Sequence, residues 1–349
     1  MTNSNIEELL INVKSIDDNT QYWLVRTMGG DYYEEYVKNG YVAIGYNEIT
    51  VNDLLHLPTK DKLARKALQA MLADRREKLK NTGYPSSQML RFSREMKIGD
   101  VVIVPSSSSF QVSFGVICSD MYEETKGLHI EGMCPFVKRR KVNWCKTYLR
   151  HKLAPGLQLM FNSRHIISEV NGYAPAIDNL LNDFYTKGNE TYLVLRVRQN
   201  ETLSADDFTL VGDLMELFNE YSKESDMGLT SEDIKMKMRV QSEGDILAFA
   251  QSPEGIAVIG LIIMFIKGGT FTINCGGFHL ETKVPSPGET FAKIAHSVNC
   301  FLNDSSRRKT VSKLRKKLDN MDIETPNAII EMMKELGKEE KQENNNKND

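Results

Sequence analysis

The sequence predicts an α+β fold in which short strands are wrapped by amphipathic helices. Short runs of β-branched and aromatic residues, with Val25, Val42 and Ile44 among them, are typical of strands. Gly-Gly and Gly-Asp pairs supply turns between the runs. Apolar residues at helical spacing fill the segments between and after them. These observations together favour a small curved sheet or barrel.

Composition predicts an ordinary globular protein of two domains. The 349 residues suit two domains at the usual size of about 100–200 residues each. The apolar content of 41% and the charged content of 26% are those of folded proteins. Five scattered cysteines without paired spacing, and the absence of a signal peptide, predict reduced thiols and a cytoplasmic location. The histidines do not cluster with the cysteines, so no zinc site is expected.

The first half is predicted to contain most of the strands. Residues 22–46 form a strand, a glycine turn, a short helix and a second strand, and a basic helix follows over about residues 60–80. A second helix precedes a buried strand over residues 101–104, whose hairpin partner is 110–117. A further strand is expected over residues 137–144.

Positive charge is concentrated in this half, although the whole chain carries a net charge of −3. Residues 60–152 contain 19 lysines or arginines and 9 acids, which is a local excess of +10. Such an excess is the footprint of a polyanion-binding surface, although a solvated helix face over residues 60–80 explains part of it. The expected contacts to a nucleic-acid backbone are Arg91, Arg94, Lys138, Arg139, Arg140 and Lys141.

The order of motifs in this half matches a known pattern. The series comprises Trp23 to Arg26 before a glycine turn, Val42 to Tyr46, Phe92 ahead of Gly99 to Val102, Val104-Pro105, Gly115-Val116, Tyr122, and Arg140 to Trp144. This series resembles the PUA-like, EVE-related domain at the N-terminus of many Mrr-type restriction endonucleases and related prokaryotic defence proteins. The resemblance covers about residues 20–183.

The resemblance implies a pseudobarrel whose concave face reads a nucleobase, in several relatives a modified base flipped from a duplex. A flipped base requires aromatic walls and polar groups at its Watson–Crick edge. The positions that match the motifs, or follow the Val-Pro strand end, are Trp23, Arg26, Tyr46, Ser106, Ser107, Tyr122 and Trp144. Tyr46 stands where the family more commonly has tryptophan. Packing in the core is the alternative role for each of these residues.

The second half is predicted to be a smaller α+β domain over residues 186–336, after a first domain over residues 1–185. Strands are expected over residues 191–199 and 234–241, with a helix over residues 204–221 between them. The C-terminal part is helical, and residues 337–349, rich in Lys, Glu and Asn, form a disordered tail. The expected role is an effector module or a docking site for a protein partner of the same defence system.

An apolar run of 12 uncharged residues, 255–266, interrupts this second domain. Spanning a bilayer takes roughly 17–25 residues, so a buried segment is the favoured interpretation. The alternative is a membrane-associated effector, in which the run acts together with residues 307–317, a segment of seven cations and no acid.

A nuclease is a second alternative for the second domain. A metal-dependent restriction core pairs an upstream acid with Glu-x-Lys, in which the acids hold Mg²⁺ and the lysine activates water. Glu281 and Lys283 have this spacing, with Asp245 or Glu254 as the upstream acid. No other cofactor is predicted. The main prediction is a DNA-binding protein of prokaryotic defence or restriction type that recognises a flipped or modified base through its first domain.

Overall fold

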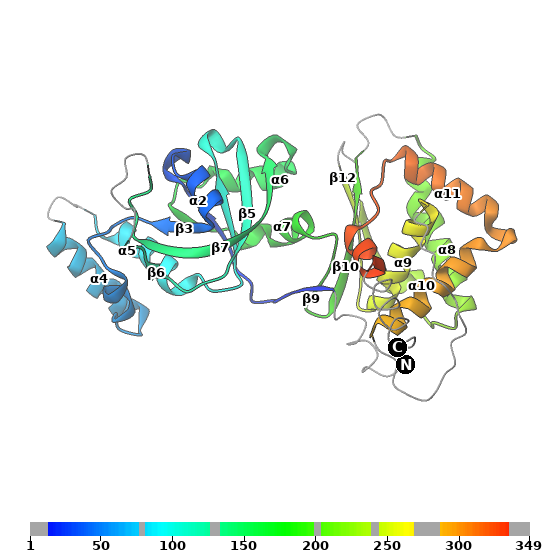
Figure 1. Ribbon diagram of the computed structural model, residues 1–349, viewed down its shortest axis with the longest axis horizontal. Helices are drawn as coiled ribbons and strands as arrows, with labels where there is room; N and C mark the ends of the chain where they lie inside the picture. The colour runs from blue at the N-terminus through cyan, green and yellow to red at the C-terminus, as the bar shows by residue number, and fades with distance from the viewer. Residues whose placement is uncertain are drawn as a thin grey trace, which may run out of the picture. The chain divides into compact units, whose positions relative to one another are not determined.

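The computed structural model describes residues 13–76, 81–125, 133–198, 204–238, 244–268 and 287–334 (Figure 1). The chain divides into two compact units. Asn19–Leu181 forms the inserted unit, and Met1–Asp18 with Asn182–Asp349 forms the outer unit. The sequence placed residues 1–185 in one domain, whereas β1 (Lys14–Ile16) pairs in parallel with β9 (Phe184–Lys187) in the outer unit. The predicted tail over residues 337–349 lies outside the described residues.

The inserted unit is built on a curled seven-stranded sheet with the order β3-β7-β5-β4-β2-β8, and β6 is attached to β7. Its strands are β2 (Tyr22–Val25), β3 (Tyr41–Ile44), β4 (Val101–Pro105), β5 (Gln111–Ile117), β6 (Tyr122–Glu123), β7 (Lys138–Leu149) and β8 (Ile167–Glu169). Its helices are α2 (Tyr33–Asn39), α3 (Val51–Leu55), α4 (Asp61–Arg75), α5 (Gly83–Leu90), α6 (Pro155–Gln158) and α7 (Ala174–Leu181). The expected hairpin is confirmed as β4 and β5, and the overall class is α+β.

The sheet curls because β7 changes partner along its length. Its first residues pair with β3, and the rest pairs with β5. The register between β5 and β7 shifts between Phe114 and Gly115, which is a β-bulge. Bulges bend a strand and increase its twist. A Cβ atom at Gly115 would lie 2.5 Å from Val142 and 2.7 Å from Trp144, so only glycine fits at this bend.

A buried carboxylate joins β2 to β4. The side chain of Asp100, just before β4, accepts hydrogen bonds from the backbone N–H groups of Gln21 (3.1 Å) and Lys97 (2.8 Å) and from the indole N–H of Trp23 (2.9 Å). β2 and β4 run parallel, with Trp23 opposite Val102. Three donors satisfy a carboxylate that burial would otherwise destabilise.

The outer unit is a five-stranded sheet with a helical layer. The sheet order is β1-β9-β10-β12-β11, with β10 (Glu190–Val197), β11 (Lys235–Met238) and β12 (Gly244–Ala250). The helices are α8 (Leu210–Glu224), α9 (Pro253–Ile266), α10 (Pro287–Asn303) and α11 (Arg308–Asn320). Figure 1 shows α9 next to the sheet, with α8, α10 and α11 around it. The predicted strands at 191–199 and 234–241 correspond to β10 and β11.

The apolar run forms the centre of this helical layer. Every residue of α9 except Glu254 and Phe265 is buried, and the helix packs in one cluster with Leu193, Leu217 and Leu314. The expectation of a buried segment is confirmed. Within the described part of the chain, no helix has the length and apolar character needed to cross a bilayer.

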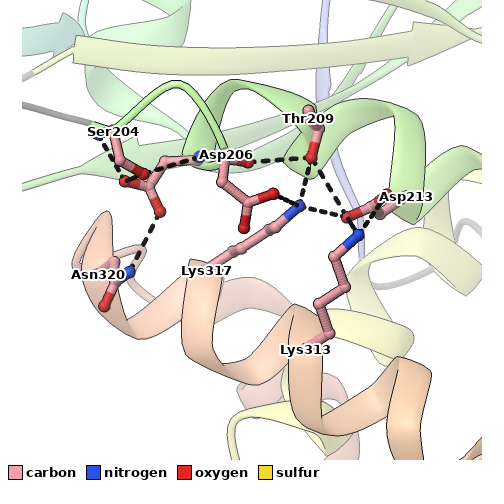
Figure 2. A network of polar contacts seen from close by, with 8 residues as sticks. Ser204, Asp206, Thr209, Asp213, Lys313, Lys317 and Asn320 are labelled. Carbon is pink, nitrogen blue, oxygen red and sulfur yellow. Dashed lines mark hydrogen bonds and ion pairs between the residues drawn. The ribbon is translucent and has the colours of Figure 1, made fainter.

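A buried lysine fastens α11 to the start of α8 (Figure 2). Lys317 is 1% exposed, and its ammonium group contacts Thr209, Asp213 and, at 3.3 Å, Asp206. Lys313, one turn earlier and exposed, reaches Asp213 at 3.2 Å. Burial alone would raise the pKa of Asp213, but the two lysines outweigh it and hold this pKa below its ordinary value.

Replacing Trp23 with Phe should destabilise the inserted unit by about 1–3 kcal/mol, because the buried Asp100 carboxylate loses a donor. The matched control is Trp144→Phe, since the Trp144 indole donates to the Tyr36 carbonyl in a half-buried place that water can reach. The control should cost roughly 1 kcal/mol or less. These are the two tryptophans of the chain, so urea unfolding followed by the remaining indole's fluorescence measures each effect. Equal losses in both variants would contradict this role of Asp100.

Replacing Lys317 with Met should destabilise the outer unit by roughly 2 kcal/mol or more, because Asp213 and Thr209 lose their buried partner. The loss should stay below the roughly 3–5 kcal/mol of fully buried pairs, since Asp206 is exposed. Lys313→Met removes a cation from the same helix and the same carboxylate, but at an exposed position, and should cost about 0–1 kcal/mol. Urea unfolding followed by circular dichroism distinguishes the two variants. A Lys317→Met variant as stable as Lys313→Met would show that the network does not fasten α11.

Candidate functional site

Turns from distant parts of the chain meet at one edge of the curled sheet. Because β2 and β4 are parallel, their carboxyl ends lie at the same edge, and β7, antiparallel to β5, also ends there. The turns that follow are η1 (Met28–Gly30), η3 (Ser107–Ser109) and η4 (Arg150–Lys152). Ligands of mixed sheets often bind where such turns gather, so this edge is a candidate binding site.

The two turns η1 and η3 touch each other through a glycine. A Cβ atom at Gly30 (φ +115°) would lie 2.2 Å from the backbone nitrogen of Ser107, so only glycine allows this approach. Met28, Ser108 and Ser109 also have positive φ values, of 51°, 53° and 55°. Non-glycine residues with such left-handed backbone angles store strain of about 1–3 kcal/mol each, and such strain concentrates at functional sites.

Arg26, at the end of β2, organises a fourth turn, η5 (Leu159–Asn162). Its Nη2 donates hydrogen bonds to the carbonyl oxygens of Phe161 and, at 2.6 Å, of Ser163. One guanidinium nitrogen thus holds two backbone groups about 135 residues away in the sequence. The turn after α6 is therefore fixed against the end of β2.

The space between these turns is an open pocket of about 670 Å³, which we call the arginine pocket. Its lining is Arg26, Gly29, Phe161, Asn162, Ser163 and Arg164. It combines two guanidinium groups, an aromatic ring and two short polar side chains, and it contains no carboxylate. The volume lies in the range of about 300–1,000 Å³ that is typical of small-ligand sites.

The electrostatics of the pocket favour an anion. Arg150 lies beside it, with its guanidinium 5.4 Å from the centroid of the Phe161 ring. Burial, and then the charge of Arg150, hold the pKa of Arg26 below its ordinary value. In the described ranges of the chain, no carboxylate pairs with Arg26, Arg150 or Arg164. Two repelling cations without a counter-charge are stabilised by binding a negative group.

Exposed apolar side chains surround this edge. Met28 in η1 is 57% exposed, Phe110 after η3 is 61% exposed, and Leu159 in η5 is 60% exposed. The backbone oxygen of Phe110 accepts a hydrogen bond from the N–H of Arg150, which places Phe110 next to Arg150. Exposed apolar groups grouped around a pocket are typical of a binding surface.

The tryptophans predicted to form the walls of a base pocket lie elsewhere. Trp23 is 2% exposed and donates to Asp100, so it presents no ring face to a ligand, contrary to the expectation. Trp144 is half-buried against the same core cluster and donates to the Tyr36 carbonyl. Both indoles bury large apolar area next to a satisfied N–H, which is how tryptophan stabilises a core.

The two predicted tyrosines are not in the arginine pocket either. Tyr46 packs against the core cluster, has a φ of 63°, and lies under the guanidinium of Arg76 at 5.7 Å. Tyr122 is half-buried on β6 and pairs with Arg139 of β7. Of the predicted aromatic residues, three share one packed core instead of lining a hollow.

The two predicted serines differ from each other. The Oγ of Ser106 accepts a hydrogen bond from the backbone N–H of Gln111 at 2.8 Å, so it closes the β4–β5 turn. Ser107 is exposed and touches Gly30, next to Gly29 of the pocket lining. The structure therefore brings Arg26, Ser106 and Ser107 to the same edge, and of the seven predicted residues Arg26 is the one that lines the pocket.

Three of the four cations predicted on β7 are buried and bound to the protein itself. Lys138 is 0% exposed and donates to the carbonyls of Tyr46 and Ile49, each at 2.8 Å. Burial lowers the pKa of Lys138 to about 8. Arg139 and Arg140, exposed by 8% and 3%, also donate to backbone carbonyls. Their expected contact with a nucleic-acid backbone is thus contradicted, because their donors are already used.

The remaining predicted cations are only partly available. Arg91 donates to the Ile167 carbonyl at 2.8 Å, and Arg94 donates to the Leu57 carbonyl at 2.9 Å, so both hold the π-helical turn η2 (Arg91–Glu95) in place. Lys141 is exposed on β7. Of the six cations predicted to contact a nucleic-acid backbone, Lys141 is the one that is exposed.

The basic segment 307–317 is largely neutralised by the outer unit. Arg307 pairs with Glu220 and Glu224. Lys313 and Lys317 pair with Asp213. Arg315 donates to the Ile266 carbonyl, so four of the seven cations contact the protein. Arg308, Lys309 and Lys316 are exposed and make no such contact with the residues that the structure describes. A membrane-bound role would also require α9 to leave the core.

The proposed nuclease residues Glu281 and Lys283 lie outside the described residues. Of the two upstream acids, Asp245 lies 3.7 Å from Arg196, and Glu254 accepts a hydrogen bond from Ser252 at the start of α9. Among the residues that the structure describes, no group of three or more His, Cys, Asp or Glu is arranged to hold a metal ion. Nothing described here brings Mg²⁺ ligands together.

Sequence reasoning missed Asn162, Ser163 and Arg164 as site residues. Phe161-Asn162-Ser163-Arg164 is a polar turn between apolar segments, and that is a weak signal by itself. Arg26 holds this turn through two hydrogen bonds, and no local pattern reveals a contact over that separation.

Residues 22–163 match a family model described as Domain of unknown function (DUF8426). The match contains every residue of the arginine pocket except Arg164, which follows directly. None of the curated proteins and none of the solved structures compared with this chain matches it.

The stability of the inserted unit should rise with pH through Lys138. The folded-state pKa of about 8 lies below the value of about 10.4 in an unfolded chain, so burying the charged lysine costs stability below pH 8. The cost is relieved as pH rises toward 10. Between pH 7.5 and 10, the unfolding free energy of the wild type relative to Lys138→Met should increase by about 2 kcal/mol. Urea unfolding followed by tryptophan fluorescence measures the difference, and a constant difference would show that Lys138 titrates normally.

Proposed function

We propose that the inserted unit is a PUA-like, EVE-related domain that binds DNA in a prokaryotic defence system and holds one flipped or modified nucleotide in the arginine pocket. The observation that carries the proposal is a pocket of about 670 Å³ that contains two guanidinium groups, Asn162, Ser163 and no carboxylate. The curled sheet, the α+β class and the order of the motifs over residues 20–183 are compatible with such a domain.

The groups in the pocket suit the parts of a nucleotide. Guanidinium groups bind phosphate through paired charge-assisted hydrogen bonds. Amide and hydroxyl side chains such as Asn162 and Ser163 can donate to and accept from a base edge. Exposed Phe110 and Met28 offer apolar contacts to a ring or sugar. The site differs from the one expected from the sequence, because Arg26 lines the pocket whereas Trp23 and Trp144 do not.

The second unit takes the role of effector or partner-docking module in this proposal. Its apolar run is used internally, and its basic segment is mostly paired. Neither observation favours a membrane effector, so DNA binding is the function that the described residues support best.

The test measures binding of the full chain to duplexes bearing different cytosine and adenine modifications, at a fixed salt concentration. Arg164→Gln should weaken binding by about tenfold or more, because a hydrogen bond to a charged group is worth about 1.5–3 kcal/mol. Arg65→Gln is the matched control, since Arg65 is an exposed arginine of α4 outside the pocket lining.

Lys141→Gln adds a discriminating variant. Lys141 lies on β7, the basic strand that the sequence analysis favoured. If Lys141→Gln lost binding and Arg164→Gln did not, the DNA would contact β7 and not the arginine pocket. No binding of any duplex by the wild-type chain would reject the proposal.

A further inference from the structure

Arg26 in the pocket lining and Arg150 beside it differ from the cations of the outer unit in having no counter-charge. Arg307 pairs with Glu220 and Glu224, and Lys317 pairs with Asp206 and Asp213. Around Arg26 and Arg150, the described residues supply carbonyl oxygens and an aromatic ring only. The local charge is therefore uncompensated by the protein.

Several hydrogen-bond donors of these arginines are also unused. A guanidinium carries five N–H donors. The two bonds of Arg26 come from Nη2, and its Nε and Nη1 make none with any described residue. The Nε of Arg150 is buried and has no hydrogen-bond partner. A buried donor without a partner in a native structure calls for an explanation, and a bound water or ion is one.

From this surplus of charge and donors, we propose that the arginine pocket selects a nucleotide whose phosphate is a terminal monoester, on a strand end or on a free mononucleotide. A phosphate monoester carries about −1.5 to −2 charges at pH 7 and three acceptor oxygens, whereas a diester inside a strand carries one charge. Arg26, Arg150 and exposed Arg164 match the more highly charged group in both charge and donors. This inference rests on the proposed function for its nucleotide site, and it puts a terminal nucleotide in that site in place of a base flipped from inside a duplex.

The position of the pocket agrees with a strand end. Asn162 and Arg164 of its lining are exposed, and the exposed side chains of Phe110 and Leu159 offer apolar contacts nearby. A terminal nucleotide has one covalent neighbour in place of two, so it enters such a pocket without the unstacking of a base inside a duplex, which costs a few kcal/mol.

The experiment compares matched ligands on the full chain by fluorescence anisotropy and calorimetry. The pairs are one oligonucleotide with 5′-phosphate or 5′-hydroxyl, the same oligonucleotide with 3′-phosphate or 3′-hydroxyl, and a nucleoside monophosphate or its nucleoside. The wild-type chain should bind at least one monoester about tenfold or more tightly than its hydroxyl partner. The pair that shows the preference identifies the source as a 5′ end, a 3′ end or a free nucleotide.

Two further readouts connect the preference to the pocket. Arg164→Gln should reduce the preference to roughly threefold or less, and Arg65→Gln should leave it unchanged. The preference should also increase from pH 5.5 to 7.5, because the second pKa of a phosphate monoester is about 6 and a hydroxyl end does not titrate there.

Equal affinity for phosphate and hydroxyl partners in every pair would overturn this inference. The proposed function would then still stand if Arg164→Gln weakened both partners equally. A chain that binds no nucleotide and no oligonucleotide would remove both proposals. A preference that survives Arg164→Gln and Arg26→Lys would place the phosphate outside this pocket and would also overturn the inference.

Discussion

The arrangement of the inserted unit depends on satisfying one buried carboxylate. Asp100 receives donors from Gln21, Lys97 and Trp23, and these bonds hold the start of β4 beside β2. The parallel pairing that follows puts the carboxyl ends of both strands at one edge. Arg26 and Ser107 reach the same place for that reason. A core interaction that never touches a ligand thus determines where the candidate site can form.

The described cations of this protein have three different kinds of partner. These differences explain why the count of positive charges over residues 60–152 did not locate the candidate site. Lys138, Arg139 and Arg140 donate to backbone carbonyls in the interior of the inserted unit. Lys317 and Arg307 pair with carboxylates in the outer unit. The arginine pocket gathers two guanidinium groups and has no acid in its lining. The local excess of positive charge over residues 60–152 is real, but its buried members stabilise the fold, and the two arginines that line the pocket lie outside that segment.

The sequence predicted the fold class and most elements, because strand and helix periodicities are local properties. The hairpin of β4 and β5 and the burial of residues 255–266 follow from patterns within a few residues. The candidate site was less predictable. Whether Trp23 lines a hollow or fills a core depends on Asp100, which lies 77 residues away. The contact of Arg26 with Phe161 spans a still longer separation, and no periodicity reports it.

The chain leaves the outer sheet after β1, builds the whole inserted unit, and returns as β9. Parallel neighbours need a connection of about a dozen residues or more, and here an entire folded body is that connection. During synthesis, β1 leaves the ribosome long before its partner. At about 5–20 residues per second, it waits on the order of ten to thirty seconds. The inserted unit can fold in that interval, whereas the outer sheet closes only after translation has passed β9.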